Sequence, residues 1–119
     1  MKLQKGYRVY VAGPYGRRNG NTEKECEDNV NWAIIWSRLL ISRGLRPFIP
    51  HLYHYVHKGW IHSPDENDWL ELCLTWIPHC HCLLRLPGES MGADNEVARA
   101  KSYAIPIYYS IEALLDDLE

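Results

Sequence analysis

The chain has 119 residues, of which 46% are hydrophobic and 24% charged, a composition typical of one globular domain spanning residues 1–119. A formal net charge of −2 argues against nucleic-acid binding, and no apolar run is long enough to cross a membrane. The charged first residues lead directly into a strand-like run, unlike a signal peptide. We therefore expect a cytoplasmic protein whose four cysteines are reduced thiols.

Strands and helices are predicted to alternate along the chain. Runs rich in β-branched and aromatic residues predict strands over residues 7–12, 45–50, 82–86 and 105–109. This alternation is typical of parallel strands joined by right-handed crossovers, with helices on both faces of the sheet. The expected fold class is α/β, a Rossmann-like or flavodoxin-like three-layer sandwich with a parallel sheet of four to five strands.

The helices are predicted from their capping residues. Thr22-x-x-Glu25 forms a capping box, and Gly44 follows the last apolar position of that helix. Ser63 with Pro64 and Glu66 predicts a second start, with an apolar stripe over Trp69, Leu72, Cys73 and Trp76. Further helices are expected over residues 92–103 and 111–118, and residues 51–62 are expected to form an aromatic, histidine-rich loop.

Ligands of parallel sheets bind beyond the carboxyl ends of the strands, where two glycine-containing loops are predicted to meet. Glycine lets backbone approach a sugar or phosphate closely, and a helix N-terminus supplies amide donors. Arg17, Arg18 and Arg85 could add charge for a phosphate, although exposed arginines are more often solvated. The candidate substrate-binding residues on this rim are Gly13, Pro14, Tyr15, Gly16, His51, Ser90 and Gly92.

Glu96 is the first candidate for chemistry. It lies in the first turns of the helix predicted over 92–103 and shares a face with the small residues Ala93 and Ala100. That face packs against the rest of the fold and directs the carboxylate toward the ligand edge. The alternative is an ordinary glutamate at a helix start.

Asp68 is the second candidate carboxylate. It adjoins Trp69 and lies four residues from Leu72, beside the predicted apolar stripe, where desolvation would raise its pKa and suit proton donation. The alternative is an early-helix acid. Two carboxylates converging on one pocket suit cleavage of a glycosidic bond, and Tyr10 at the end of the first strand could orient the attacking one. The alternative for Tyr10 is a core aromatic residue.

The histidines offer a metal hypothesis. His51-x-x-His54-x-x-His57 could supply three zinc ligands, but the spacing matches no strong metal motif. Aromatic packing or substrate contact is the favoured interpretation, and no metal or organic cofactor is expected.

Four motifs together resemble the nucleoside 2-deoxyribosyltransferase-like superfamily, which also includes nucleoside 5′-monophosphate N-glycosidases. They are V-Y-V-A-G-P-Y, P-F-I-P-H-L-Y-H, D-W-L-E-L and L-L-R-L-P-G-E-S-M-G-A-D-N-E-V, and the last is the most specific. Its short bacterial and phage branch is the most similar. One departure is Cys80-His81, where relatives usually carry Cys-Asp before the strand.

The resemblance implies roles for the candidate residues. Glu96, six residues after Ser90, would be the nucleophile that forms a glycosyl-enzyme intermediate. Tyr10 would position it, Asp68 would contact the base or assist proton transfer, and Ser90 would hold the sugar or phosphate. The resemblance thus implies a nucleoside or nucleotide substrate and a homodimer or larger oligomer in which a neighbouring subunit completes the site. The alternative is a non-catalytic nucleotide-binding module.

Overall fold

The computed structural model describes residues 2–16 and 21–119, so Arg17 and Arg18 lie outside the described residues. It contains a four-stranded sheet in the order β2-β1-β3-β4, with every pairing parallel. The strands are β1 Arg8–Ala12, β2 Arg46–Phe48, β3 Cys82–Arg85 and β4 Ile107–Tyr108. The predicted α/β fold with a parallel sheet is confirmed.

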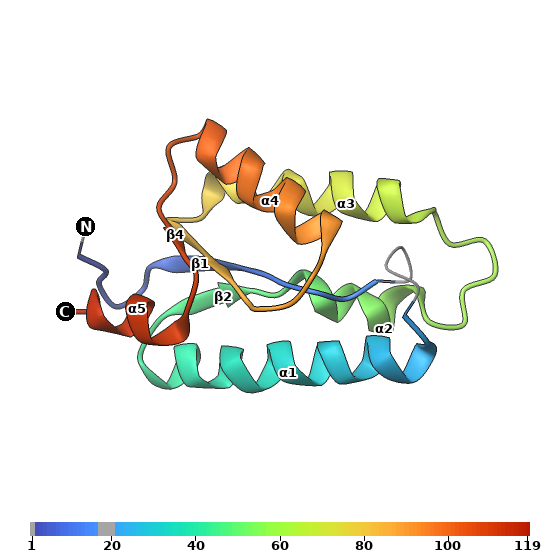
Figure 1. Cartoon of the computed structure of the whole chain (residues 1–119), viewed down its shortest axis with the longest axis horizontal. Helices are drawn as coiled ribbons and strands as arrows, with labels where there is room; N and C mark the ends of the chain where they lie inside the picture. The colour runs from blue at the N-terminus through green and yellow to red at the C-terminus, as the bar shows by residue number, and fades with distance from the viewer. Residues whose placement is uncertain (1, 17–20) are drawn as a thin grey trace.

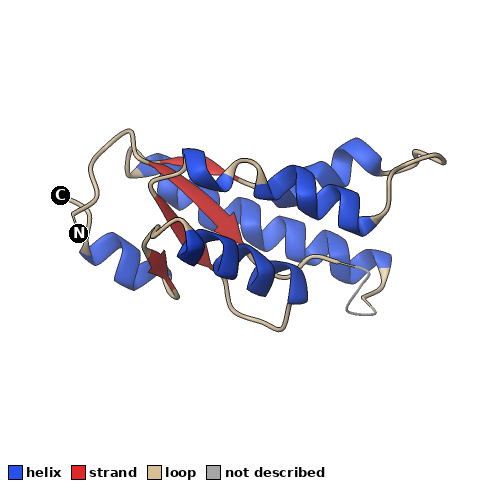
Figure 2. Ribbon diagram, turned by 90° about the horizontal axis from the view of Figure 1, so that it is seen from above, coloured by secondary structure: helices blue, strands red, loops and turns tan. Residues whose placement is uncertain are grey.

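Helices cover both faces of this sheet. They are α1 Glu23–Ser42, α2 Tyr53–His57, α3 Glu66–Leu74, α4 Met91–Ser102 and α5 Ile111–Asp116. Figure 1 shows α1 below the strands with α3 and α4 above them, and Figure 2 shows the strands crossing between the helices. Within residues 2–16 and 21–119, no helix has both the length and the apolar character needed to cross a membrane.

The alternation of side chains along β1 divides the core into two parts. Val9 and Val11 pack with α1 and α5, whereas Tyr10 and Ala12 pack with α3 and α4. All four side chains are fully buried. Tyr10 therefore faces the layer that contains Glu96.

Two of the predicted helix starts are confirmed by their capping hydrogen bonds. The Oγ1 of Thr22 accepts from the backbone N–H of Glu25, whose carboxylate accepts in return from the N–H of Thr22. The Oγ of Ser110 caps α5 by accepting from the N–H of Ala113. Gly44 follows the first of these helices with a φ of +85°, the left-handed conformation that favours glycine there.

The prediction that residues 51–62 form a loop is wrong in its first half. A 3₁₀ helix, Pro50–Leu52, runs directly into α2. Both turns bury a histidine, His51 and His54, against the rest of the fold. Tertiary burial of these side chains favours helical backbone that the local sequence does not predict.

Helix α3 also begins later than predicted. Asp65, not Ser63, is its N-cap, and the Oδ1 of Asp65 accepts from the backbone N–H of Asp68. Ser63 instead accepts a hydrogen bond from the indole N–H of Trp69. The predicted apolar stripe is only partly buried, because Leu72 and Trp76 are exposed.

Candidate active site

A pocket of about 800 Å³ lies at the carboxyl ends of the first three strands. Gly13 follows β1, His51 follows β2 and Ser90 follows β3, and all three residues line it. The remaining wall comes from α2, from the segment joining α2 to α3, from α3, from the first turns of α4 and from Glu23 at the start of α1. This is the edge where parallel α/β sheets bind ligands, as the sequence predicts.

Glu96 lines the floor of the pocket, and its hydrogen-bond partner Tyr10 lies beneath it, outside the lining. The phenol of Tyr10 donates to Oε2 of Glu96. Tyr10 is fully buried, and Glu96 is only 6% exposed. Glu96 reaches this position because α4 turns its small residues, Ala93 and Ala100, toward the sheet. The predicted shared face of these residues is confirmed.

Burial dominates the electrostatics of this pair. Loss of solvent raises the pKa of Glu96 to about 7, although the hydrogen bond from Tyr10 and the charge of Arg85 oppose that rise. Burial and the neighbouring Glu96 carboxylate also raise the pKa of Tyr10, so the phenol remains a protonated donor. Above neutral pH the pocket therefore presents one desolvated carboxylate, oriented by one hydrogen bond.

Two tightly packed loops hold the rim of the pocket. A Cβ on Gly13 would lie 2.9 Å from Cβ of Leu86, and one on Gly88 would lie 2.7 Å from Cγ of Pro14. Gly88 also has a φ of +114°, which L side chains rarely adopt. Only glycine fits these two positions, so the backbone after β1 and β3 approaches closely.

The predicted rim residues take different positions. Gly13, Tyr15, Gly16, His51, Ser90 and Gly92 all line the pocket, whereas Pro14 packs on Gly88 and is not part of the lining. The Oγ of Ser90 caps α4 by accepting from the N–H of Ala93 at 3.0 Å. Ser90 thus fixes the helix that carries Glu96 and faces the pocket itself.

His51 ties the second strand's loop to the first. Its Nε2 lies 3.2 Å from the carbonyl oxygen of Pro14. Burial lowers the pKa of His51 to about 4, so the ring is neutral at physiological pH and Nε2–H donates to that carbonyl. A neutral imidazole here is a positioning group for the Pro14 loop.

The structure does not bring Asp68 to this site. Asp68 is exposed and is absent from the described pocket lining, which instead includes Asp65 and Glu66. The physical reason is the orientation of α3, which buries Cys73 and Leu74 but leaves Leu72, four residues from Asp68, exposed. The argument for desolvation of Asp68 therefore fails.

Sequence reasoning missed Glu66 as a site residue and treated it only as a helix-start signal. Glu66 is half-buried and lines the pocket. Aromatic rings line the same pocket, with Trp69 lying 5.4 Å from Tyr53 and 5.6 Å from His57 between ring centroids. An acid at a capped helix start, followed by Trp69 one turn later, was the available signal.

Cys73 lies at the pocket, whereas the Cys80-His81 pair lies away from it. Cys73 lines the pocket, but burial and Glu96 raise its pKa to about 12, so it is a neutral thiol there. The Cys80-His81 departure lies at the opposite, amino end of β3. There His81 stacks on Tyr7 and its Nδ1 accepts from the backbone N–H of Arg8. That departure does not touch the pocket.

Comparison with known proteins identifies the fold. No family model matches the sequence, and no curated protein matches it. A 2-deoxyribosyltransferase from the psychrotolerant bacterium Bacillus psychrosaccharolyticus matches with a TM-score of 0.53 and 14% identity, over 93% of this chain and 82% of that one. A 2-deoxyribosyltransferase from Leishmania mexicana matches with a TM-score of 0.53 and 14% identity, over 85% of this chain and 61% of that one. The resemblance drawn from the motifs is confirmed at the level of the fold.

Proposed function

We propose that this protein cleaves the N-glycosidic bond of a nucleoside or a nucleoside 5′-monophosphate. The observation that carries the proposal is the buried Tyr10–Glu96 pair at the floor of a pocket large enough for such a ligand. The structural neighbours are 2-deoxyribosyltransferases, and one is described as a biocatalyst for nucleoside synthesis. Site chemistry and fold therefore support the same substrate class.

In the proposed reaction, an oxygen of the Glu96 carboxylate attacks C1′ of the sugar. The bond from C1′ to the base nitrogen breaks, and its electron pair leaves with the base, which takes up a proton. Water, or a second base, then attacks C1′ from the vacated side, gives up a proton to the group that protonated the first base, and releases Glu96. Two inversions give net retention at C1′. The Tyr10 phenol holds Glu96 in the attacking orientation throughout.

We propose Glu66 as the group that passes a proton to the leaving base, the role first expected of Asp68. Glu66 lines the pocket from the first turn of α3 and is half-buried, whereas Asp65 is exposed. A half-buried carboxyl group facing a pocket can exchange a proton with a bound base. The aromatic wall formed by Tyr53, His57 and Trp69 supplies flat surfaces on which a base can stack.

The test is a screen of nucleosides and 5′-monophosphates for release of free base, with and without an acceptor base. We expect release from at least one substrate, and mass spectrometry should detect a glycosyl adduct on Glu96. Glu96→Gln should reduce release by about 10³-fold or more. Glu89→Gln, which alters an exposed acid in the neighbouring loop, is the matched control and should retain activity.

Two outcomes would overturn the proposal. If the wild type binds nucleotides but releases no base from any of them, the protein is a binding module. If Glu96→Gln retains full activity, a different group attacks the sugar. Sedimentation of the same samples tests the proposed homodimer, which the resemblance implies.

A further inference from the structure

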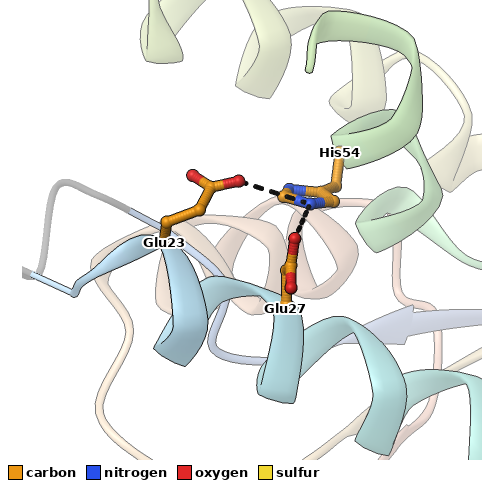
Figure 3. Close-up of side chains that lie close together, drawn as sticks. All are labelled: Glu23, Glu27 and His54. Carbon is orange, nitrogen blue, oxygen red and sulfur yellow. Dashed lines mark ion pairs between the residues drawn. The ribbon is translucent and has the colours of Figure 1, made fainter. Parts of the chain in front are cut away.

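A second group of ionisable side chains lies apart from the Tyr10–Glu96 pair, between α1 and α2. It consists of Glu23 and Glu27, one helical turn apart on α1, and His54 of α2. Figure 3 shows both carboxylates directed at the imidazole ring. One ligand atom from each residue lies within 4.8 Å of the other two.

The central observation is that the His54 imidazole is buried with one ring nitrogen lacking a hydrogen bond. His54 is only 2% exposed, and among the described residues its Nε2 has no hydrogen-bond partner. Nε2 lies 3.8 Å from Oε1 of Glu23 and 3.8 Å from Oε1 of Glu27. Both distances are too long for a hydrogen bond. A buried polar nitrogen is therefore aimed between two acidic oxygens without bonding to either.

The distance from Nε2 of His54 to each carboxylate oxygen is close to that between two ligands of one metal ion. Tetrahedral ligands about 2.1 Å from zinc lie about 3.4 Å apart, so each carboxylate oxygen would move a few tenths of an ångström toward Nε2. The two carboxylate oxygens, which lie within 4.8 Å of each other, would approach by up to about 1.4 Å through rotation of their side chains. The other ring nitrogen is already held, because Nδ1 of His54 lies 2.7 Å from the phenol oxygen of Tyr15. When Nδ1 donates to that oxygen, Nε2 keeps the lone pair that a metal needs.

We propose that Glu23, Glu27 and His54 bind one divalent transition-metal ion of the zinc type, with solvent completing its coordination. Imidazole nitrogen with two carboxylates is a ligand set that favours zinc over magnesium, which binds oxygen ligands. The ion would join α2, a helix of five residues without a side-chain cap, to the longest helix of the fold. It would thereby fix the wall of the pocket that His54 and His57 line.

One neighbouring cation competes with the metal. The Nζ of Lys58 lies 2.7 Å from Oε1 of Glu27. Lys58 is exposed and sits at the end of α2, so its side chain can leave Glu27 without disturbing the core. Displacement of this ammonium group is part of the proposed binding step.

Chelator-treated full-length protein, titrated with ZnCl₂ and separately with MgCl₂ in a calorimeter, tests the proposal. We expect one zinc ion per chain, a higher melting temperature with zinc, and much weaker binding of magnesium. Glu23→Gln should weaken zinc binding by at least about tenfold. The matched control is Asp28→Asn, which removes the same charge from the same helix. Native Asp28 pairs only with Lys24 in the described contacts, so this variant should bind zinc as wild type does.

X-ray absorption at the zinc edge gives a readout that does not depend on catalysis. Nitrogen and oxygen ligands without sulfur are expected. Sulfur ligands would assign the ion to the cysteines and overturn the proposal, as would absence of binding or a Glu23→Gln variant that binds zinc as tightly as wild type. Because the exposed Glu23 carries this test, a fold defect in a His54 variant does not confuse it. The result is also independent of whether the protein cleaves nucleosides.

Discussion

The Tyr10–Glu96 pair and the Glu23–Glu27–His54 group use glutamate in opposite ways. Glu96 is buried beside one neutral donor, and burial raises its pKa to about 7. Glu27 is half-buried beside Lys58, and the hydrogen bond and charge of that lysine lower its pKa. In the first region burial desolvates a single carboxylate, and in the second two more accessible carboxylates surround a buried nitrogen. Solvent exposure, not residue type, separates a candidate nucleophile from candidate ligands.

Glu66 is half-buried like Glu27 but lines the pocket near Glu96, and its substitution gives the largest predicted effect on that comparison. Glu66→Gln should reduce base release by about 10²-fold or more, because a proton donor to the leaving base is lost. Asp68→Asn, two residues along the same helix and exposed, should stay within about threefold of wild type in the same steady-state assay. The reverse pattern would restore Asp68 to the proton-transfer role.

Substitution of Glu96 and of Glu27 should change the free energy of unfolding in opposite directions. A pKa raised from 4.5 to about 7 means that folded Glu96 keeps its proton between those pH values while the unfolded chain loses it, so its ionisation opposes folding as pH rises. Glu96→Gln should therefore raise the unfolding free energy by up to about 3 kcal/mol at pH 8 and by almost nothing at pH 4. Urea unfolding at both pH values measures the difference.

Glu27→Gln should show the opposite sign in the same experiment. Its lowered pKa stabilises the fold above the unfolded value and loses that contribution as pH falls, so the variant should be slightly less stable than wild type at pH 8 only. A gain of stability in Glu27→Gln, or none in Glu96→Gln, would contradict the contrast between the two regions.

Tyr10→Phe tests the orientation of Glu96 with a smaller expected effect. The hydrogen bond from Tyr10 favours the charged form of Glu96, so its loss should raise the pKa of Glu96 further. The acidic limb of the kcat/KM profile should move to higher pH, and the rate at its plateau should fall about tenfold. A plateau loss without movement of the limb would indicate that Tyr10 only fills space.

The sequence predicted most of the fold because its elements carry strong local signals. The Thr22 capping box, the Gly44 stop and the Ser110 cap each fix a boundary by their own chemistry. The period-two pattern of β1 and the shared face of Ala93 and Glu96 likewise depend only on neighbours in sequence. Those signals were sufficient to predict that Tyr10 and Glu96 face the same region.

The remaining errors concern contacts distant in sequence. Burial of His51 and His54 depends on the Pro14 loop and on α1, so residues 51–57 fold into helical turns that local propensity does not indicate. The start of α3 was displaced because Ser63, a good cap, instead hydrogen bonds to Trp69. The site assignment changed because α3 buries Cys73 and Leu74, not Leu72, so Asp68 lies on an exposed face of the helix.

The smallest predicted effect comes from the competition between Lys58 and a metal ion for the Glu27 carboxylate. Lys58→Gln removes an ammonium group that a metal ion must displace from Oε1 of Glu27. Exposed ion pairs contribute about 0.2–1 kcal/mol, so zinc affinity should rise by about 1.4- to 5-fold in the calorimeter. Lys24→Gln is the matched control, because native Lys24 pairs with Asp28 on the same helix. It should change zinc affinity less. If Lys58→Gln weakens zinc binding instead, Lys58 supports the carboxylate geometry, and the two charges act together at Glu27.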